Sequence, residues 1–389
     1  MAPHLEIFRF ARITMIVSGI WKLELCDPFK HCSRVYPIYS VMVHVIYTSF
    51  PLLLLINFPH LVKNDPSEAM ETISKILYGI LSIVKLFSYQ SESSQCLLAK
   101  AIQEEGHLND HGDDFVKRIH ELHVSYCNVF NKFILMSVVF GGSVLCEFGI
   151  ADSYKFHRLP KNESVNVAKP LPLPFWYPFD ENKHHVWVLV EQLLTIVWCA
   201  LLFISVQIFS NSALIYMRGQ LKILQKSFKE FHQNMVEGDS NSGLTALKHI
   251  CVKHQNLIGY INTANRAFRT VVFFEYGISS AMLATALFQV VAGRNVTTNV
   301  IHVSVLTSQL LLLAWSSDEI VAQSLELAPA LYQSNWYECD KDSRILIRIM
   351  LMRCQKPLSI DIGSFGAMTV RSAMSRLKLA YSYTSVMTK

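Results

Sequence analysis

Three clusters of histidine and acidic residues have side chains that can ligate a metal ion. The stretch HLNDHGDD covers residues 107–114, HELH covers residues 120–123, and the pair His184-His185 follows two acidic residues. None of them has the ligand spacing of a zinc signature, and a solvated helix or loop explains each better. The sequence also contains no nucleotide-binding loop, nucleophile elbow or paired-carboxylate pattern. We therefore expect no metal, no cofactor and no catalysis.

These polar residues belong to a very apolar chain. Of its 389 residues, 51% are hydrophobic and only 17% are charged, whereas a soluble domain has about 25% charged residues. The net charge of +5 is modest, and no basic cluster interleaved with aromatic residues points to nucleic acid. The composition indicates a multi-pass protein whose surroundings are membrane lipid.

Seven stretches are candidates to cross a bilayer, which takes about 20 mostly apolar residues. Two are weak, because the second contains Lys75 and Lys85 and the seventh contains three basic residues. In chain order the stretches are the region between Arg34 and Lys63, Met70 to Tyr89, Cys127 to Ile150, the stretch from Val186, Thr270 to Val291, the region between Arg294 and Asp318, and Ile362 to Val386. The predicted fold class is an all-α membrane protein with seven transmembrane helices.

The distribution of Lys and Arg predicts an inverted topology, with a cytoplasmic N-terminus and an extracellular C-terminus. The segments on the inner side then carry the larger share of basic residues, although the loop 150–185 dissents. Both N-x-[ST] sequons, at Asn162 and Asn295, fall on the outer side and are candidate glycosylation sites. None of the nine cysteines lies in a predicted outer loop, so we expect no extracellular disulfide framework.

Four motifs in order resemble the insect odorant receptor family. They are LPLPFWYPFD at 171–180, LAPALYQSNWYE at 327–338, the stretch around RCQKPL at 353–358, and the ending LAYSYTSV at 379–386. This resemblance implies an odorant-gated cation channel, assembled as a tetramer with a cytoplasmic anchor. Because the loop between spans four and five is compact, the chain resembles an odorant-tuning subunit rather than the longer olfactory co-receptor.

The implied protein is the odorant-binding subunit of a heteromeric, non-selective cation channel in the plasma membrane of olfactory neuron dendrites. Its partners would be the olfactory co-receptor and a small volatile odorant or pheromone. The predicted segments are a cytoplasmic N-terminal segment (1–38), spans one to six with their loops (39–316), an anchor segment with a short helix at Asp342 to Cys354 (317–361), and span seven with the C-terminus (362–389). Within the second segment, 151–185 is an outer loop and 211–268 a cytoplasmic loop.

Span seven is expected to line the pore, where an aqueous lumen tolerates hydroxyls and charges. The spacing of Leu377, Tyr381, Thr384 and Thr388 places them on one charge-free helical face. The resemblance assigns the gate to the last turns, which here contain Thr384, Met387 and Thr388. Other members often carry bulky aliphatic residues there, so this subunit would leave much of a hydrophobic gate to the co-receptor.

The resemblance also places an odorant pocket in the outer half of the membrane, between spans two, three, four and six. Candidate contacts by depth are Ile73, Leu77, Tyr78, Phe140, Ser143, Val144, Gln192, Ile196 and Val305. Apolar residues at this spacing also arise from plain helix packing. Lys85 and Glu275 lie towards the cytoplasmic ends of their spans, where snorkelling or pairing would explain them.

Two other classes of receptor stay open. A gustatory receptor channel has a related architecture but a different terminal motif, usually containing Thr-Tyr. A G-protein-coupled receptor has its N-terminus outside, and usually a disulfide between its second outer loop and third span. The side of the membrane on which the N-terminus lies distinguishes the latter.

Overall fold

The computed structural model describes residues 6–21, 35–64, 66–111, 113–158, 171–236 and 240–387. Within them the regular elements are helices, and the one β-bridge joins Asp361 to Ala367. The helices are α1 (Arg9–Val17), α2 (Tyr36–Asn64), α3 (Pro66–Tyr89), α4 (Glu92–His111), α5 (Asp114–Arg158), α7 (His185–Val236), α8 (Ser240–Val291), α9 (Val296–Leu325), α10 (Leu327–Tyr332), η2 (Trp336–Glu338), α11 (Lys341–Cys354) and α12 (Val370–Met387). The predicted all-α fold is confirmed.

Among the described residues, five helices are long and apolar enough to cross a membrane. They are Tyr36–Asn64, Asp114–Ser143, His185–Phe231, Leu244–Val291 and Val296–Tyr332. Helices α3 and α12 correspond to the two stretches that the sequence marks as weak, and they are not among these five. The count of seven spans and the inverted topology are consistent with this arrangement and stay predictions.

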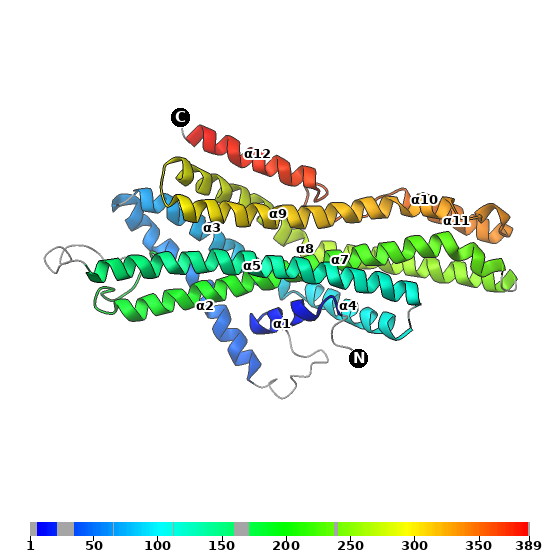
Figure 1. The fold of residues 1–389 in the computed structure, drawn as a ribbon, viewed down its shortest axis with the longest axis horizontal. Coiled ribbons are helices and arrows are strands. Elements are labelled where there is room, and N and C mark those ends of the chain that lie inside the picture. The colour runs from blue at the N-terminus through cyan, green and yellow to red at the C-terminus, as the bar shows by residue number, and fades with distance from the viewer. Residues whose placement is uncertain are drawn as a thin grey trace.

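The long helices extend well beyond the predicted spans at one end of the molecule. Figure 1 shows α7, α8 and α9 running along the long axis towards α10 and α11, with α12 near the opposite end. The predicted cytoplasmic loop 211–268 is therefore mainly helical, because α7 continues to Val236 and α8 begins at Ser240. Helix α11 covers the short helix predicted in the anchor, and its N-terminus is capped by Asp340, whose Oδ2 accepts from two backbone N–H groups at 3.1 and 3.2 Å.

A tight turn decides where the last helix begins. Gly363 and Gly366 have positive φ angles of 57° and 95°, which favour glycine. The N–H of Ile362 donates to the carbonyl of Gly366 at 2.7 Å and closes this turn. Helix α12 consequently starts at Val370 and not at the predicted position 362.

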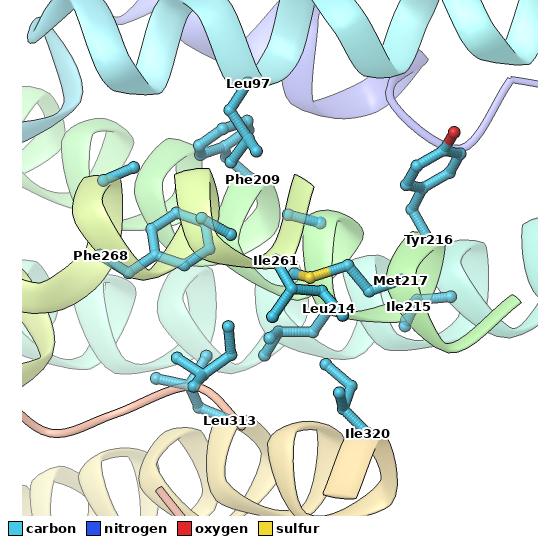
Figure 2. Close-up of a cluster of buried hydrophobic side chains, with 14 of the residues drawn as sticks. Leu97, Phe209, Leu214, Ile215, Tyr216, Met217, Ile261, Phe268, Leu313 and Ile320 are labelled. Atoms are coloured by element: carbon cyan, nitrogen blue, oxygen red, sulfur yellow. The ribbon is translucent and has the colours of Figure 1, made fainter. Parts of the chain in front are cut away.

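The core surrounds the middle of α7. Every residue from 202 to 217 is buried, as expected for a helix that is enclosed on all sides. Figure 2 shows the inner part of this core, where Phe209 of α7 lies between Leu97 of α4 and Phe268 of α8. The rings of Phe209 and Phe268 meet edge to face with centroids 5.9 Å apart.

A buried acidic residue docks the N-terminal helix onto α4. The backbone N–H of Ile7 donates to Oε1 of Glu105 at 3.0 Å. This N–H lies just before α1, whose first residue has no side-chain cap, so Glu105 of α4 satisfies a donor near the start of that helix. Burial is the main cause that raises the pKa of the Glu105 carboxyl to about 8. Nε2 of His120 lies 3.7 Å from the same oxygen.

We predict that a rise in pH from 4.5 to 8 loosens this docking. The carboxyl ionises near pH 4.5 when exposed and near pH 8 when docked, so the docked state holds the extra proton between these values. Its contribution to stability is full below pH 4.5 and falls as the pH rises towards 8. Hydrogen-exchange protection of residues 7–17, corrected for intrinsic rates, should therefore decline over this range. Glu105→Gln, which cannot ionise, should keep protection constant; an identical decline in this variant would contradict the assignment.

Candidate ligand-binding site and pore helix

A small internal cavity lies where α3, α7, α8 and α9 meet. Its volume is about 10 Å³, roughly the room that one water molecule needs. Its apolar lining consists of Leu81, Phe203, Met282, Leu306 and Leu310, and its polar lining of Glu275, Ser279 and Gln309. An apolar enclosure with a few grouped polar side chains is the usual composition of a small-molecule site.

One wall of the cavity is built on a buried ion pair. Nζ of Lys85 on α3 lies 3.0 Å from Oε1 of Glu275 on α8, and the two side chains are 0% and 14% exposed. The same ammonium lies 4.2 Å from the ring centroid of Phe203. Of the two explanations that the sequence leaves open for these residues, the structure selects pairing. Each charge needs the other in an apolar bundle, so the pair also holds α3 against α8.

A column of aromatic rings connects the cavity wall to the outer loop. The Phe203 ring stacks on Tyr78 with centroids 4.0 Å apart. Tyr78 meets Phe50 at 6.5 Å, and Phe50 meets Phe175 of the outer loop at 5.8 Å, both edge to face. The column requires α2 and α3 to approach closely at Gly79, where an added Cβ would lie 2.6 Å from Pro51.

The outer loop is clamped to the bundle through its backbone. Gln192 of α7 accepts from the N–H of Leu173 at 3.0 Å and donates to its carbonyl at 2.9 Å. Asn57 of α2 donates to the carbonyl of Pro174 at 3.0 Å. As a result Phe175 is only 2% exposed, and the segment 171–175 closes the bundle beside α2, α3 and α7.

The nine predicted odorant contacts occupy varied positions, and none of the eight cavity-lining residues is among them. Tyr78 stands one layer behind the cavity wall, and fully buried Gln192 has both amide atoms committed to Leu173. Ile73, Leu77, Ile196 and Val305 are half-buried, Phe140 and Ser143 are exposed, and the side chain of Val144 lies outside the described residues. Their contact with an odorant stays a prediction.

The cavity differs from the predicted pocket in one of its helices. Span five (α8) contributes Glu275, Ser279 and Met282, while span three (α5) contributes no lining residue. The reason is packing, because α3 lies against α8, whereas α5 lies against α7 and α9. One sequence feature could have indicated this cavity. Lys85 and Glu275 lie inside two apolar spans, and an ionisable residue within a span marks a functional site by default.

Helix α12 lies at the edge of the bundle, against α8 and α9. Thr384 is buried and its hydroxyl donates to the carbonyl of Ala284 on α8 at 3.2 Å. Leu377 is half-buried and packs on the same side, whereas Tyr381 is 71% exposed. The predicted charge-free face is therefore divided: two of its residues turn towards α8 and one turns away from the protomer. The side chain of Met387 and all of Thr388 lie outside the described residues.

The remaining candidate residues have simple surroundings. Asn295 is exposed with a positive φ of 41°, and its amide donates to Glu71 at 3.2 Å; Asn162 lies outside the described residues. In the HELH stretch, His120 faces Glu105 and Nδ1 of His123 contacts the carbonyl of Ile119 at 2.7 Å. Among the described residues no group of three His, Cys, Asp or Glu side chains is placed to hold a metal ion.

Long apolar helices packed side by side, with a more polar helix at the edge, are the architecture of a multi-pass membrane protein. The chain belongs to the 7tm odorant receptor family, whose model matches residues 65–381. This assignment agrees with the resemblance in the four motifs and sets aside the gustatory and G-protein-coupled alternatives. This family consists of receptors and not of enzymes.

Curated relatives are insect odorant receptors of moderate similarity. The chain is 25% identical to Odorant receptor 10 of Aedes albopictus over 56% of its own length and 59% of the relative's. It is 28% identical to Odorant receptor 30a of Drosophila melanogaster over 34% and 36% of the two chains. The chain thus matches about three fifths or less of the length of these relatives. Odorant receptor 82a of Drosophila melanogaster matches 84% of this chain and 85% of its own, at 21% identity.

Solved structures share the fold over nearly the whole chain. The olfactory receptor OR5 from Machilis hrabei, solved in complex with eugenol, superimposes with a TM-score of 0.78. The match covers 98% of this chain and 96% of that one at 17% identity. A second structure of the same receptor gives a TM-score of 0.77 at 18% identity.

We predict that the clamp on the outer loop depends on Gln192. Gln192→Met would leave the buried N–H of Leu173 without a partner, at a cost of about 1–3 kcal/mol, while its carbonyl would keep only the bond from the Phe175 N–H at 2.9 Å. The purified protein should unfold at a lower temperature, and added protease should cut the loop around 171–177 faster. Gln289→Met is the matched control, because the Nε2 of this buried glutamine has no partner among the described residues. Equal destabilisation by the two changes would remove the special role of Gln192.

Proposed function

We propose that this protein is the odorant-binding subunit of a heteromeric, odorant-gated, non-selective cation channel. In this proposal it lies in the plasma membrane of olfactory neuron dendrites, assembled with the olfactory co-receptor, and binds a small volatile odorant or pheromone. Membership of the odorant receptor family supports odorant detection. The eugenol bound to the Machilis receptor supports a small ligand for this fold.

The observation that carries the proposal is the short distance between the cavity and α12. Leu306 of α9 lines the cavity and also packs on a cluster formed by Leu283 and Ala284 of α8 with Ala380 of α12. Met282 lines the cavity directly beside this cluster in the chain. A ligand that enlarges the cavity must therefore displace side chains that rest on α12.

Helix α12 is the proposed wall of the ion path. Among its exposed side chains are the basic and hydroxyl groups of Arg371, Ser375, Lys378 and Ser382, which lipid would disfavour. Of the predicted pore residues, Tyr381 is also exposed. Thr384 and Leu377 support the helix from behind in the protomer.

Dependence on the co-receptor is the first test of this function. The chain resembles odorant-tuning subunits, which pair with the shared co-receptor, so we expect it to form no working channel alone. Cells that express both subunits should give odorant-evoked cation currents, and cells that express this chain alone should give little or none. Surface labelling must show equal delivery to the plasma membrane. Robust odorant currents from the chain alone would refute the heteromeric proposal.

Cysteine accessibility tests the pore wall. A cationic thiol reagent applied from outside should reduce the current of Tyr381→Cys, because that side chain is exposed. Thr384→Cys should react at least about tenfold more slowly, because its position is buried against Ala284. The unsubstituted channel gives the background from the native cysteines. If the reagent rapidly blocked the current of Thr384→Cys and had no effect on Tyr381→Cys, the ion path would lie on the opposite face of α12.

A further inference from the structure

We infer that the cavity between α3, α7, α8 and α9 is a subsite for the hydroxyl group of a neutral alcohol or phenol. The inference rests on the proposed odorant binding and assigns a chemical class to the polar end of the ligand. It concerns residues deeper along the helices than the predicted contacts, since Leu81 and Phe203 lie about one and two turns beyond Leu77 and Ile196.

The charge of the cavity wall excludes a charged ligand. Lys85 and Glu275 neutralise each other at 3.0 Å, with the ammonium fully buried beside Phe203. The described residues that line the cavity supply no other formal charge. A carboxylate or an ammonium brought into this enclosure would therefore be buried without a counter-charge of its own. A neutral ligand avoids this cost.

The hydrogen-bonding groups select a ligand that can donate as well as accept. Glu275 presents a carboxylate, which only accepts, and it still has lone pairs beyond the one used by Lys85. Gln309 lines the cavity opposite, on α9, and no described residue hydrogen-bonds its side-chain amide. The hydroxyl of Ser279 donates to the carbonyl of Glu275 in its own helix turn. A ligand hydroxyl can donate to Glu275 and accept from Gln309, whereas an ether oxygen can only accept.

The size of the cavity restricts the subsite to one small polar group. About 10 Å³ suits a single hydroxyl group, since it is roughly the room that one water molecule needs. The apolar side chains around it, among them Leu81, Met282 and Leu310, would enclose the adjoining carbons. The rest of an odorant would have to displace neighbouring side chains, because the aromatic column is closely packed, with Phe203 stacked on Tyr78 at 4.0 Å.

Binding to the purified chain tests the subsite without any channel current. The probes are 1-octanol, heptyl methyl ether, octanoate and octylamine, with 2-phenylethanol and its methyl ether as a second skeleton. Affinity is read from the rise in unfolding temperature over a concentration series in lipid nanodiscs. We expect each alcohol to bind roughly tenfold tighter than its ether, because only the alcohol donates to a charged acceptor. The acid and the amine should bind more weakly still.

Variants separate this subsite from unspecific partition into lipid. The double variant Lys85→Met with Glu275→Gln should reduce alcohol affinity about tenfold and leave ether affinity unchanged, because only the alcohol donates to Glu275. Gln309→Leu should weaken the alcohol and the ether alike, because both accept from its amide. The double variant removes both charges together, so it leaves no unpaired ion in the core. Ser304→Ala is the matched control on α9, because Ser304 is exposed and its hydroxyl donates to Val300 in the same helix.

Several results would overturn the inference. They are equal affinity for alcohol and ether, tighter binding of the acid or the amine, no detectable binding of either alcohol, or no effect of the cavity variants. The assay needs neither co-receptor nor current. Binding of alcohols together with no odorant current when the chain is co-expressed with the co-receptor would therefore count against the channel proposal alone. Odorant currents without alcohol selectivity would count against the subsite alone.

Discussion

The structure depends on the complete enclosure of one stretch of α7. Residues 202–217 are buried on every side, so the neighbouring helices must each fit a fixed surface. The polar side chains in this stretch form hydrogen bonds with different neighbouring helices. Ser205 donates to the backbone of α1 at 2.9 Å, Ser210 meets Tyr89 of α3, Ser212 lies 3.3 Å from a cysteine of α5, and Asn211 accepts from α9 at 3.2 Å. Where lipid replaces water, packing and such hydrogen bonds hold helices together, because burial from lipid gives little hydrophobic gain.

Charged residues inside the bundle follow the same constraint. Lys85 lies inside the apolar helix α3, and Glu275 supplies the opposite charge where this helix packs against α8. The basic residues of α12 are accommodated differently, because Arg371 and Lys378 are exposed at the edge of the bundle and not buried inside it. An unpaired charge would be costly in either place if lipid covered it. Both helices therefore need a polar partner. Glu275 is that partner for α3, and in the proposed channel an aqueous lumen would take this role for α12.

The cavity links these two features. It lies beside the enclosed part of α7, is walled by the ion pair, and is separated from α12 by the layer that contains Leu306 and Ala284. Close-packed interiors transmit a displacement to the next layer and do not absorb it. In the proposed channel, a ligand in this position would act on the pore helix through α8 and α9, and the outer loop clamped by Gln192 would limit access from outside.

The sequence by itself determined the fold class, the helix order and the family, because apolar runs of about 20 residues and four ordered motifs are local properties of the chain. It also located the weak spans at 70–89 and 362–386. The sequence could not determine which residues face the cavity. Apolar side chains at helical spacing are alike whether they face a ligand, lipid or another helix. The sequence therefore did not point to the cavity-lining residues Phe203 and Gln309. It did point to Gln192 as a ligand contact, but this side chain binds the backbone of the outer loop. The start of α12 and the turning of Thr384 towards Ala284 were also decided by tertiary structure, since a helical face acquires its role only from the neighbour that packs against it.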